Sequence, residues 1–230
     1  MVPDRVDPEQ NPSRSTLSPG DQVCSAPLDG LRVRLRPIHP QDYPALFKIE
    51  TGLFLGSRWR HRGTTPSYER FVAALFEGVL AQFVVVSKAS SIPRGYVTLY
   101  NANLAAGWAY VAATKFDDHD HTGEVLHGAA LMLDYAFEGW PFHKLYAEVS
   151  SSTIGAFRSM IGRVFVEEGC LTDHEYGAGR RWDLHVLAVS RARWSQWRPI
   201  VIGHVKGERY RQLGDRILPS KEWFPHAPTD

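Results

Sequence analysis

The segment from Trp108 to Gly169 constrains the fold more than any other part of this 230-residue chain. At its centre, apolar and small residues recur every three or four positions, which predicts a helix over 124–139 with one buried face. That face consists of Val125, Gly128, Ala129, Met132, Leu133, Ala136 and Phe137. Around this helix the sequence predicts strands at 108–116, 144–150 and 164–170, an acidic loop from Asp117 onward, and a short helix at 154–163.

Strands and two further helices are predicted in the rest of the chain. The arginines of 31–38 alternate with Leu31, Val33 and Leu35, which is typical of a half-buried strand. Asp42 can cap the helix that follows it, and a second helix begins near Ser67. Turns of Pro and Gly separate the other strands, which lie at 82–89, 95–104, 164–176 and 181–190.

Composition indicates a globular cytoplasmic protein. Hydrophobic residues make up 43% of the chain and the net charge is +1, so bulk charge favours neither nucleic acid nor a membrane surface. Cys24 and Cys170 provide no disulfide framework and no metal quartet, which fits a reducing compartment. No apolar run approaches the roughly 18 residues that a membrane span needs.

The chain divides into a tail, one domain and an extension. Residues 1–30 are rich in Pro, Ser and Asp and predict a disordered N-terminal tail. Residues 31–194 form the expected domain. Residues 195–230 exceed it, and we expect them to pack on it through Trp197, Ile200, Val201, Ile202, Trp223 and Phe224.

The order of these elements resembles the GNAT superfamily of N-acyltransferases over about residues 31–194. The best local matches, LDYAFEGWPFHKLYAEV and FVEEGCL, are similar to the ribosomal-protein-alanine acetyltransferase branch. The resemblance implies an α+β fold, an α/β/α sandwich whose mixed central sheet of about seven strands carries helices on both faces. It also implies an enzyme that transfers an acyl group from a pantetheine thioester to a primary amine, without a covalent enzyme intermediate.

The loop that holds the coenzyme A pyrophosphate in this family is degenerate here. The family pattern Arg/Gln-x-x-Gly-x-Gly/Ala falls on residues 120–125, where only Gly123 matches. Asp120 replaces the basic residue and Val125 the last small one. Backbone N–H groups at a helix N-terminus suit a phosphate, but the surrounding carboxylates of Asp117, Asp118, Asp120 and Glu124 compete with it.

Three alternatives for the binding of an acyl donor therefore remain open. Coenzyme A can bind through hydrogen bonds between its pantetheine arm and the splayed strands 110–115 and 148–152. A carrier protein can present the same arm as a phosphopantetheine thioester, without an adenosine pyrophosphate. Donor binding can also be lost or replaced, for example by aminoacyl-tRNA or by a purely binding role. The donor-binding residues implied by the resemblance are Ala112, Ala113, Thr114, His121, Thr122, Gly123, Ser150 and Thr153.

Candidate catalytic residues lie on the strands beside this cleft. In the family, a backbone N–H near Ala112 or Ala113 stabilises the oxyanion, and a tyrosine protonates the leaving thiolate. That tyrosine falls on Met160, and the family's usual Asn falls on Thr153. Other groups that can order the amine or move a proton are Tyr110, a Glu148 expected to be buried and facing the cleft, His174 and Tyr176.

The expected acceptor site is the basic loop between the first two helices. Its residues Arg58, Trp59, Arg60 and Arg62 suit an anionic group, an acidic carrier protein or a nucleic acid, and a solvated basic loop is the plain alternative. The resemblance implies a small-molecule or peptide amine as the acceptor. No spacing of His, Cys and Asp supports a metal site, so we expect no metal. Nucleic acid other than tRNA is not expected, and a homodimer is left open.

Overall fold

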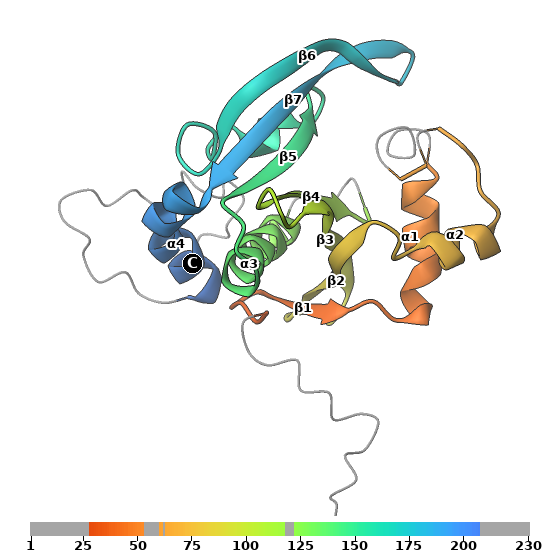
Figure 1. Cartoon of the computed structure of the whole chain (residues 1–230). Coiled ribbons are helices and arrows are strands. Elements are labelled where there is room, and N and C mark those ends of the chain that lie inside the picture. Colours follow the sequence, from red (N-terminus) through yellow and green to blue (C-terminus); the bar gives the residue numbers. More distant parts are fainter. Residues whose placement is uncertain (1–27, 53–59, 62, 118–121, 208–230) are drawn as a thin grey trace, which may run out of the picture.

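The computed structural model describes residues 28–52, 60–61, 63–117 and 122–207, and it confirms the predicted fold class (Figure 1). One mixed sheet of seven strands has the order β1-β2-β3-β4-β5-β7-β6. The strands are β1 Val33–Pro37, β2 Val79–Ser87, β3 Pro93–Asn103, β4 Trp108–Lys115, β5 Lys144–Ser150, β6 Val166–Gly177 and β7 Arg180–Ser190. The helices are η1 Pro40–Asp42, α1 Tyr43–Glu50, α2 Tyr68–Ala74, α3 Glu124–Gly139, η2 Ile154–Phe157 and α4 Arg191–Lys206.

Two antiparallel half-sheets meet at a single parallel pair. Strands β1 to β4 follow one another as antiparallel neighbours, and β5, β7 and β6 form the second antiparallel group. The helix α3 carries the chain from β4 to β5, because parallel strands need a crossover connection rather than a tight turn. The centre of the sheet is therefore where β4 and β5 lie side by side.

Helices cover both faces of the sheet. On one face α3 and α4 lie together, and the main core forms there from alternate residues of the strands, such as Val85, Leu99 and Leu187 (Figure 1). Gly128 of α3 makes this packing close, because an added Cβ would lie 2.5 Å from a methyl group of Val85. On the other face α1 and α2 enclose a smaller cluster centred on Phe71.

The C-terminal extension is part of the domain as far as the structure describes it. The helix α4 begins after the N-cap Ser190, whose hydroxyl accepts a hydrogen bond from the Arg193 N–H, and it runs through the expected boundary at 194. Val201, Ile202 and Val205 of α4 are buried in the main core. Trp223 and Phe224 lie outside the described residues.

One side chain ties α4 to the end of α3. The guanidinium of Arg191 donates to the main-chain oxygens of Phe137, Trp140 and Phe142, at 2.7, 2.5 and 2.7 Å. These carbonyls follow or close the last turn of α3, where backbone acceptors lack intrahelical donors. The C-terminal end of α3 is thus capped by a side chain from a segment fifty residues later.

Two local expectations were inaccurate. The segment 154–163 is not a regular helix, because only the 3-10 turn η2 forms and a series of turns follows. The described chain also begins before residue 31: Leu28 is buried, and its carbonyl accepts a hydrogen bond from the Leu35 N–H at 2.8 Å. Residues 1–27 lie outside the described part. Among the described residues, no helix is long and apolar enough to cross a membrane.

Candidate active site

The two central strands separate after three residue pairs. Trp108, Ala109 and Tyr110 of β4 pair with Lys144, Leu145 and Tyr146 of β5, and no later pair joins the two strands among the described residues. Both strands continue, β4 to Lys115 and β5 to Ser150. Beyond Tyr110, the edge of β4 that faces β5 therefore presents backbone groups without a strand partner.

The pairing of β3 with β4 shows which backbone groups those are. The Phe116 N–H donates to the Arg94 carbonyl at 2.9 Å, and the register runs without a shift back to Tyr110. In an antiparallel ladder, successive residues point their N–H and C=O groups alternately to the two sides. Ala112 and Thr114 therefore bond toward β3, while Val111 and Ala113 direct their N–H and C=O groups into the gap beside β5.

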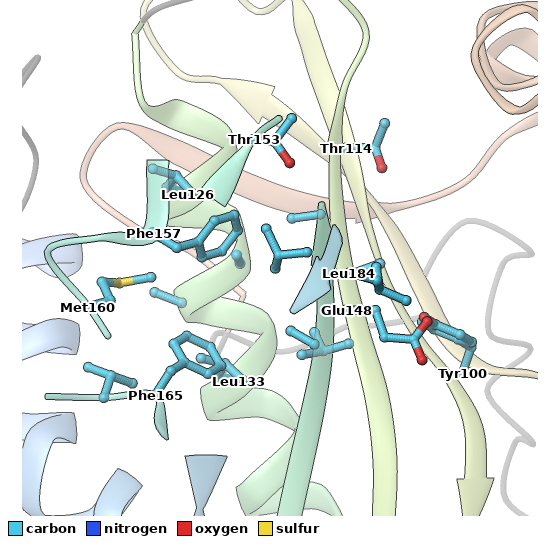
Figure 2. A pocket seen from close by; sticks show the side chains of 18 of the residues that line it. Tyr100, Thr114, Leu126, Leu133, Glu148, Thr153, Phe157, Met160, Phe165 and Leu184 are labelled. Atoms are coloured by element: carbon cyan, nitrogen blue, oxygen red, sulfur yellow. The ribbon is translucent and has the colours of Figure 1, made fainter. Parts of the chain in front are cut away.

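A cavity of about 720 Å³ occupies this gap and reaches both faces of the sheet (Figure 2). On the α3 side it is apolar, with walls from α3, from the segment after β5 and from α4. Those walls are Leu126, Ala129, Ala130, Leu133, Phe157, Met160, Val164, Phe165, Trp194 and Val201. On the other side the lining carries titratable groups, which are Tyr100, Glu148, His174, Glu175, Tyr176 and Arg181.

Glu148 and Tyr100 lie together on the polar side of the cavity. Figure 2 shows the Glu148 carboxylate beside the Tyr100 ring. Burial raises the pKa of the Tyr100 hydroxyl well above its ordinary value, and the nearby negative charge of Glu148 raises it further. The prediction that Glu148 faces the cleft is consistent with this position, but the expected burial was wrong, because Glu148 is exposed to solvent.

Tyr110 belongs to an aromatic cluster rather than to the cavity lining. Its ring lies 5.6 Å from Tyr100, 5.5 Å from Tyr146 and 5.9 Å from Trp108, measured between centroids. Burial raises its pKa, and the charge of Glu148 contributes. Tyr110 therefore supports the wall beside Glu148, and Tyr100 is the tyrosine of this cluster that lines the cavity.

The β6–β7 hairpin brings its end over the cavity. His174 and Tyr176 are both exposed and both line it, together with Glu175 and Arg181. The Arg181 guanidinium lies 5.7 Å from the centre of the Tyr176 ring. The hairpin closes at Ala178 and Gly179, which both have positive φ, in agreement with the turn predicted from GAGR.

The predicted donor residues divide between the cavity and its surroundings. Ala112, Ala113, Thr114 and Thr153 line the cavity, and so does Met160, at the position of the family's tyrosine. Ser150 is buried outside the lining, where its hydroxyl accepts a hydrogen bond from Ser152 at 2.9 Å. Its contacts serve the turn that follows β5.

The N-terminus of α3 is arranged around a buried carboxylate. Glu124 accepts a hydrogen bond from the Ser87 hydroxyl at 2.7 Å and lies 3.1 Å from Arg94 Nε. Thr122 and Gly123 precede it and are not part of the cavity lining, and His121 lies outside the described residues. The charge of Glu124 is thus directed toward β2 and β3 and is matched by Arg94.

Val125 packs on the sheet beside this carboxylate. A Cβ at Gly95 would lie 2.9 Å from a Val125 methyl group, and Val125 is buried. Val125, which stands at the last small position of the family's loop pattern, is therefore part of the core packing. Its side chain fills the core between α3 and β3.

The side chain of Arg60 makes contacts that hold the fold together. It lies 3.0 Å from the buried carboxylate of Glu50, and it donates to the carbonyls of Ala74 and Leu75 and to the side chain of Gln82. Burial raises the pKa of Glu50, and the charge of Arg60 opposes this shift. Arg60 therefore does not stand in an open basic loop as predicted, and Arg58, Trp59 and Arg62 lie outside the described residues.

Solved structures with the same arrangement identify the fold. The spermidine/spermine N-acetyltransferase SpeG from Vibrio cholerae is 19% identical, covers 72% of this chain and 96% of its own, and has a TM-score of 0.59. A probable GNAT-family acetyltransferase from Chromobacterium violaceum is 22% identical over 82% of this chain and 100% of its own, with a TM-score of 0.55. This chain has the GNAT fold.

A third similar structure was solved with bound ligands. Spermidine N-acetyltransferase from Vibrio cholerae in complex with CoA and spermine is 19% identical, covers 71% of this chain and 98% of its own, and has a TM-score of 0.57. No protein-family model matches the chain, and a search of curated protein sequences finds no match. The resemblance to the ribosomal-protein-alanine branch stays a prediction.

Proposed function

We propose that this GNAT-fold chain is an N-acyltransferase that moves an acyl group from a pantetheine thioester to a primary amine. The observation that carries the proposal is the open edge of β4, where Val111 and Ala113 face a cavity of about 720 Å³. A pantetheine arm contains two amides, and it can pair with these backbone groups as an added strand would. The thioester then lies between the two faces of the sheet.

The chemistry needs few protein groups. The amine attacks the thioester carbonyl, the developing oxyanion takes a hydrogen bond, and the carbon–sulfur bond breaks to release a thiolate. The Val111 N–H is our proposed donor to the oxyanion, because it faces the cavity beside the point where the strands separate, and the Ala113 N–H is left to pair with the pantetheine arm. The new amide forms directly, and Cys170 is not proposed as a nucleophile, because it is exposed and lies outside the cavity lining.

Glu148 is our candidate for receiving the acceptor amine. Its carboxylate stands at the exposed side of the cavity, where it can hold an ammonium group and accept the proton that the amine must lose. The titratable residues of the hairpin end, His174 and Tyr176, lie on the same side and can pass that proton to solvent. The V. cholerae structure with CoA and spermine supports a small-molecule amine as acceptor.

Coenzyme A is the donor that we propose first, and a holo carrier protein is the alternative. The complex of the V. cholerae enzyme with CoA supports the first. The second is favoured by the surroundings of Thr122 and Gly123, which lie outside the cavity lining beside the acidic segment that begins at Asp117. We place the reaction in the cytoplasm, and aminoacyl-tRNA and a homodimer stay predictions.

Binding and turnover together test the proposal. Calorimetry with CoA, with pantetheine and with a holo carrier protein should show binding of at least one of them, and release of free thiol from an acyl-CoA should require an amine. If the adenosine end contributes little, pantetheine and CoA will bind within about tenfold of each other. Absence of binding by all three ligands would refute the assignment of the cleft, and binding without turnover would indicate a binding module.

A substitution of Glu148 tests its role separately. Glu148→Gln should lower kcat/KM for the amine by roughly 10²-fold or more, as loss of a proton acceptor does, without changing CoA affinity. Glu77→Gln is the matched control, since Glu77 is an exposed carboxylate outside the cavity lining. An unchanged kcat/KM in Glu148→Gln would show that Glu148 does not act on the amine.

A further inference from the structure

Three side chains of different chemistry meet on the β6–β7 hairpin, outside the cavity. They are Glu167 and Cys170 of β6 and His185 of β7, and one ligand atom of each lies within 4.8 Å of the other two. His185 Nδ1 and Glu167 Oε1 are already 2.9 Å apart. A carboxylate, a thiolate and an imidazole are together the ligands that zinc and related divalent metals take in proteins.

A regular strand would not bring these residues together. Glu167 and Cys170 are three positions apart, and odd spacing places side chains on opposite faces of a strand. Here the register shifts: Glu167 pairs with Leu187 and Cys170 with His185, while Gly169 pairs with Val186. Because Leu187 and His185 are two positions apart on β7, their partners Glu167 and Cys170 share one face.

The β-bulge that makes this possible has one extra residue, Glu168. It has no place in the register, and its carboxylate lies 2.8 Å from Lys144 Nζ of β5. A β-bulge changes the direction in which neighbouring side chains point, and bulges are common next to active sites. The positions of Glu167, Cys170 and His185 in the sequence therefore do not indicate a cluster, because the bulge is what brings their side chains together.

We propose that Glu167, Cys170 and His185 form a binding site for a divalent metal of borderline softness such as Zn²⁺. Metal–ligand bonds of about 2.0–2.3 Å require the three ligand atoms to lie within about 4 Å of one another. Glu167 and Cys170 are exposed and can make the small rotations needed. Three protein ligands leave a fourth position for water or another ligand.

The position of the site indicates what the metal does. The three ligands are not part of the cavity lining, whereas Leu171 and the hairpin end from His174 to Tyr176 are. A metal held by both strands would cross-link β6 to β7 just before that end. We therefore assign it a positioning role, in which it stabilises the hairpin that closes the polar side of the cavity, and no step of acyl transfer passes through it.

Cobalt is the probe that tests the site, because a Co²⁺–thiolate bond gives an intense near-ultraviolet charge-transfer band. The chain has two cysteines, so the band can come only from Cys170 or Cys24. Titration of the untagged, reduced full chain should give the band at one equivalent of Co²⁺, and Zn²⁺ should displace it. The band should persist in Cys24→Ser and vanish in Cys170→Ser.

The other ligands and a control complete the test. His185→Ala should weaken Co²⁺ binding by about tenfold or more, whereas Glu168→Gln should not, because Glu168 belongs to the same bulge but contacts Lys144 instead. Zn²⁺ should also raise the melting temperature of the native chain but not that of Cys170→Ser. No band, a band that survives in Cys170→Ser, or equal affinity in His185→Ala would each overturn the site. None of these readouts depends on acyl transfer.

Discussion

Proline at two neighbouring positions of β4 tests the geometry of the cleft directly. Ala113→Pro removes an N–H that points into the gap, and Ala112→Pro removes one that bonds toward β3. Proline is tolerated where a strand edge is open, whereas inside a ladder it costs a hydrogen bond and creates clashes. We expect the lost hydrogen bond alone to lower the free energy of unfolding of Ala112→Pro by about 1–3 kcal/mol, and we expect Ala113→Pro to lower it by clearly less.

For CoA affinity we expect the opposite order, with the larger loss in Ala113→Pro. Ala113→Pro leaves a ligand carbonyl without its donor, which costs about 1–3 kcal/mol and weakens CoA binding by roughly 5- to 150-fold. Urea unfolding gives the stabilities, and calorimetry at a temperature where both variants are folded gives the affinities. Wild-type affinity in a folded Ala113→Pro would refute the pairing of the ligand with this edge. A larger loss of stability in Ala113→Pro than in Ala112→Pro would refute the alternation.

Three further changes probe the packing around the site. Arg191→Met, which removes three hydrogen bonds at the end of α3, should cost roughly 2–4 kcal/mol in urea unfolding, and Arg191→Lys should recover only part of this because it lacks the fork. Gly128→Ala should be destabilising, although alanine favours helices, because its Cβ meets Val85; a stabilised variant would contradict the close packing of α3. Burial lowers the pKa of His127 to about 3, so unfolding binds a proton between that pH and about 6.5. The free energy of unfolding should therefore fall by up to about 1.4 kcal/mol per pH unit on acidification through this window, and His127→Leu, but not the exposed control His143→Gln, should lose that part of the slope.

The fold was predictable because its elements have regular periods. The α3 helix was predicted with its observed bounds from its apolar spacing, and the strands followed from alternation and from turns such as GAGR. The segment 154–163 was predicted wrongly as a helix, because its apolar residues Phe157 and Met160 line a cavity as well as packing against the main core. Apolar spacing alone does not separate these two environments.

The site was predictable only in part, because its polar groups depend on register. Tyr100 was missed, although β3 alternates and places Tyr96, Thr98 and Tyr100 on one face; no signal in one strand tells which neighbour that face meets. The role of Arg60 was misread because its partner Glu50 lies on α1, ten residues away, and a charge cluster in sequence does not show which member is buried. The cluster of Glu167, Cys170 and His185 was missed because a bulge altered the spacing of its members.

The sparse contact between β4 and β5 has a consequence for how the protein holds together. Among the residues that the structure describes, only three residue pairs between strands join the half-sheet made by the first four strands to the half-sheet made by the last three, and packing in the main core supplies the rest of the connection. A ligand seated in the gap would add a connection between the two half-sheets beside the main core that they share. Amide exchange should therefore slow in strands on both sides when the cleft is filled.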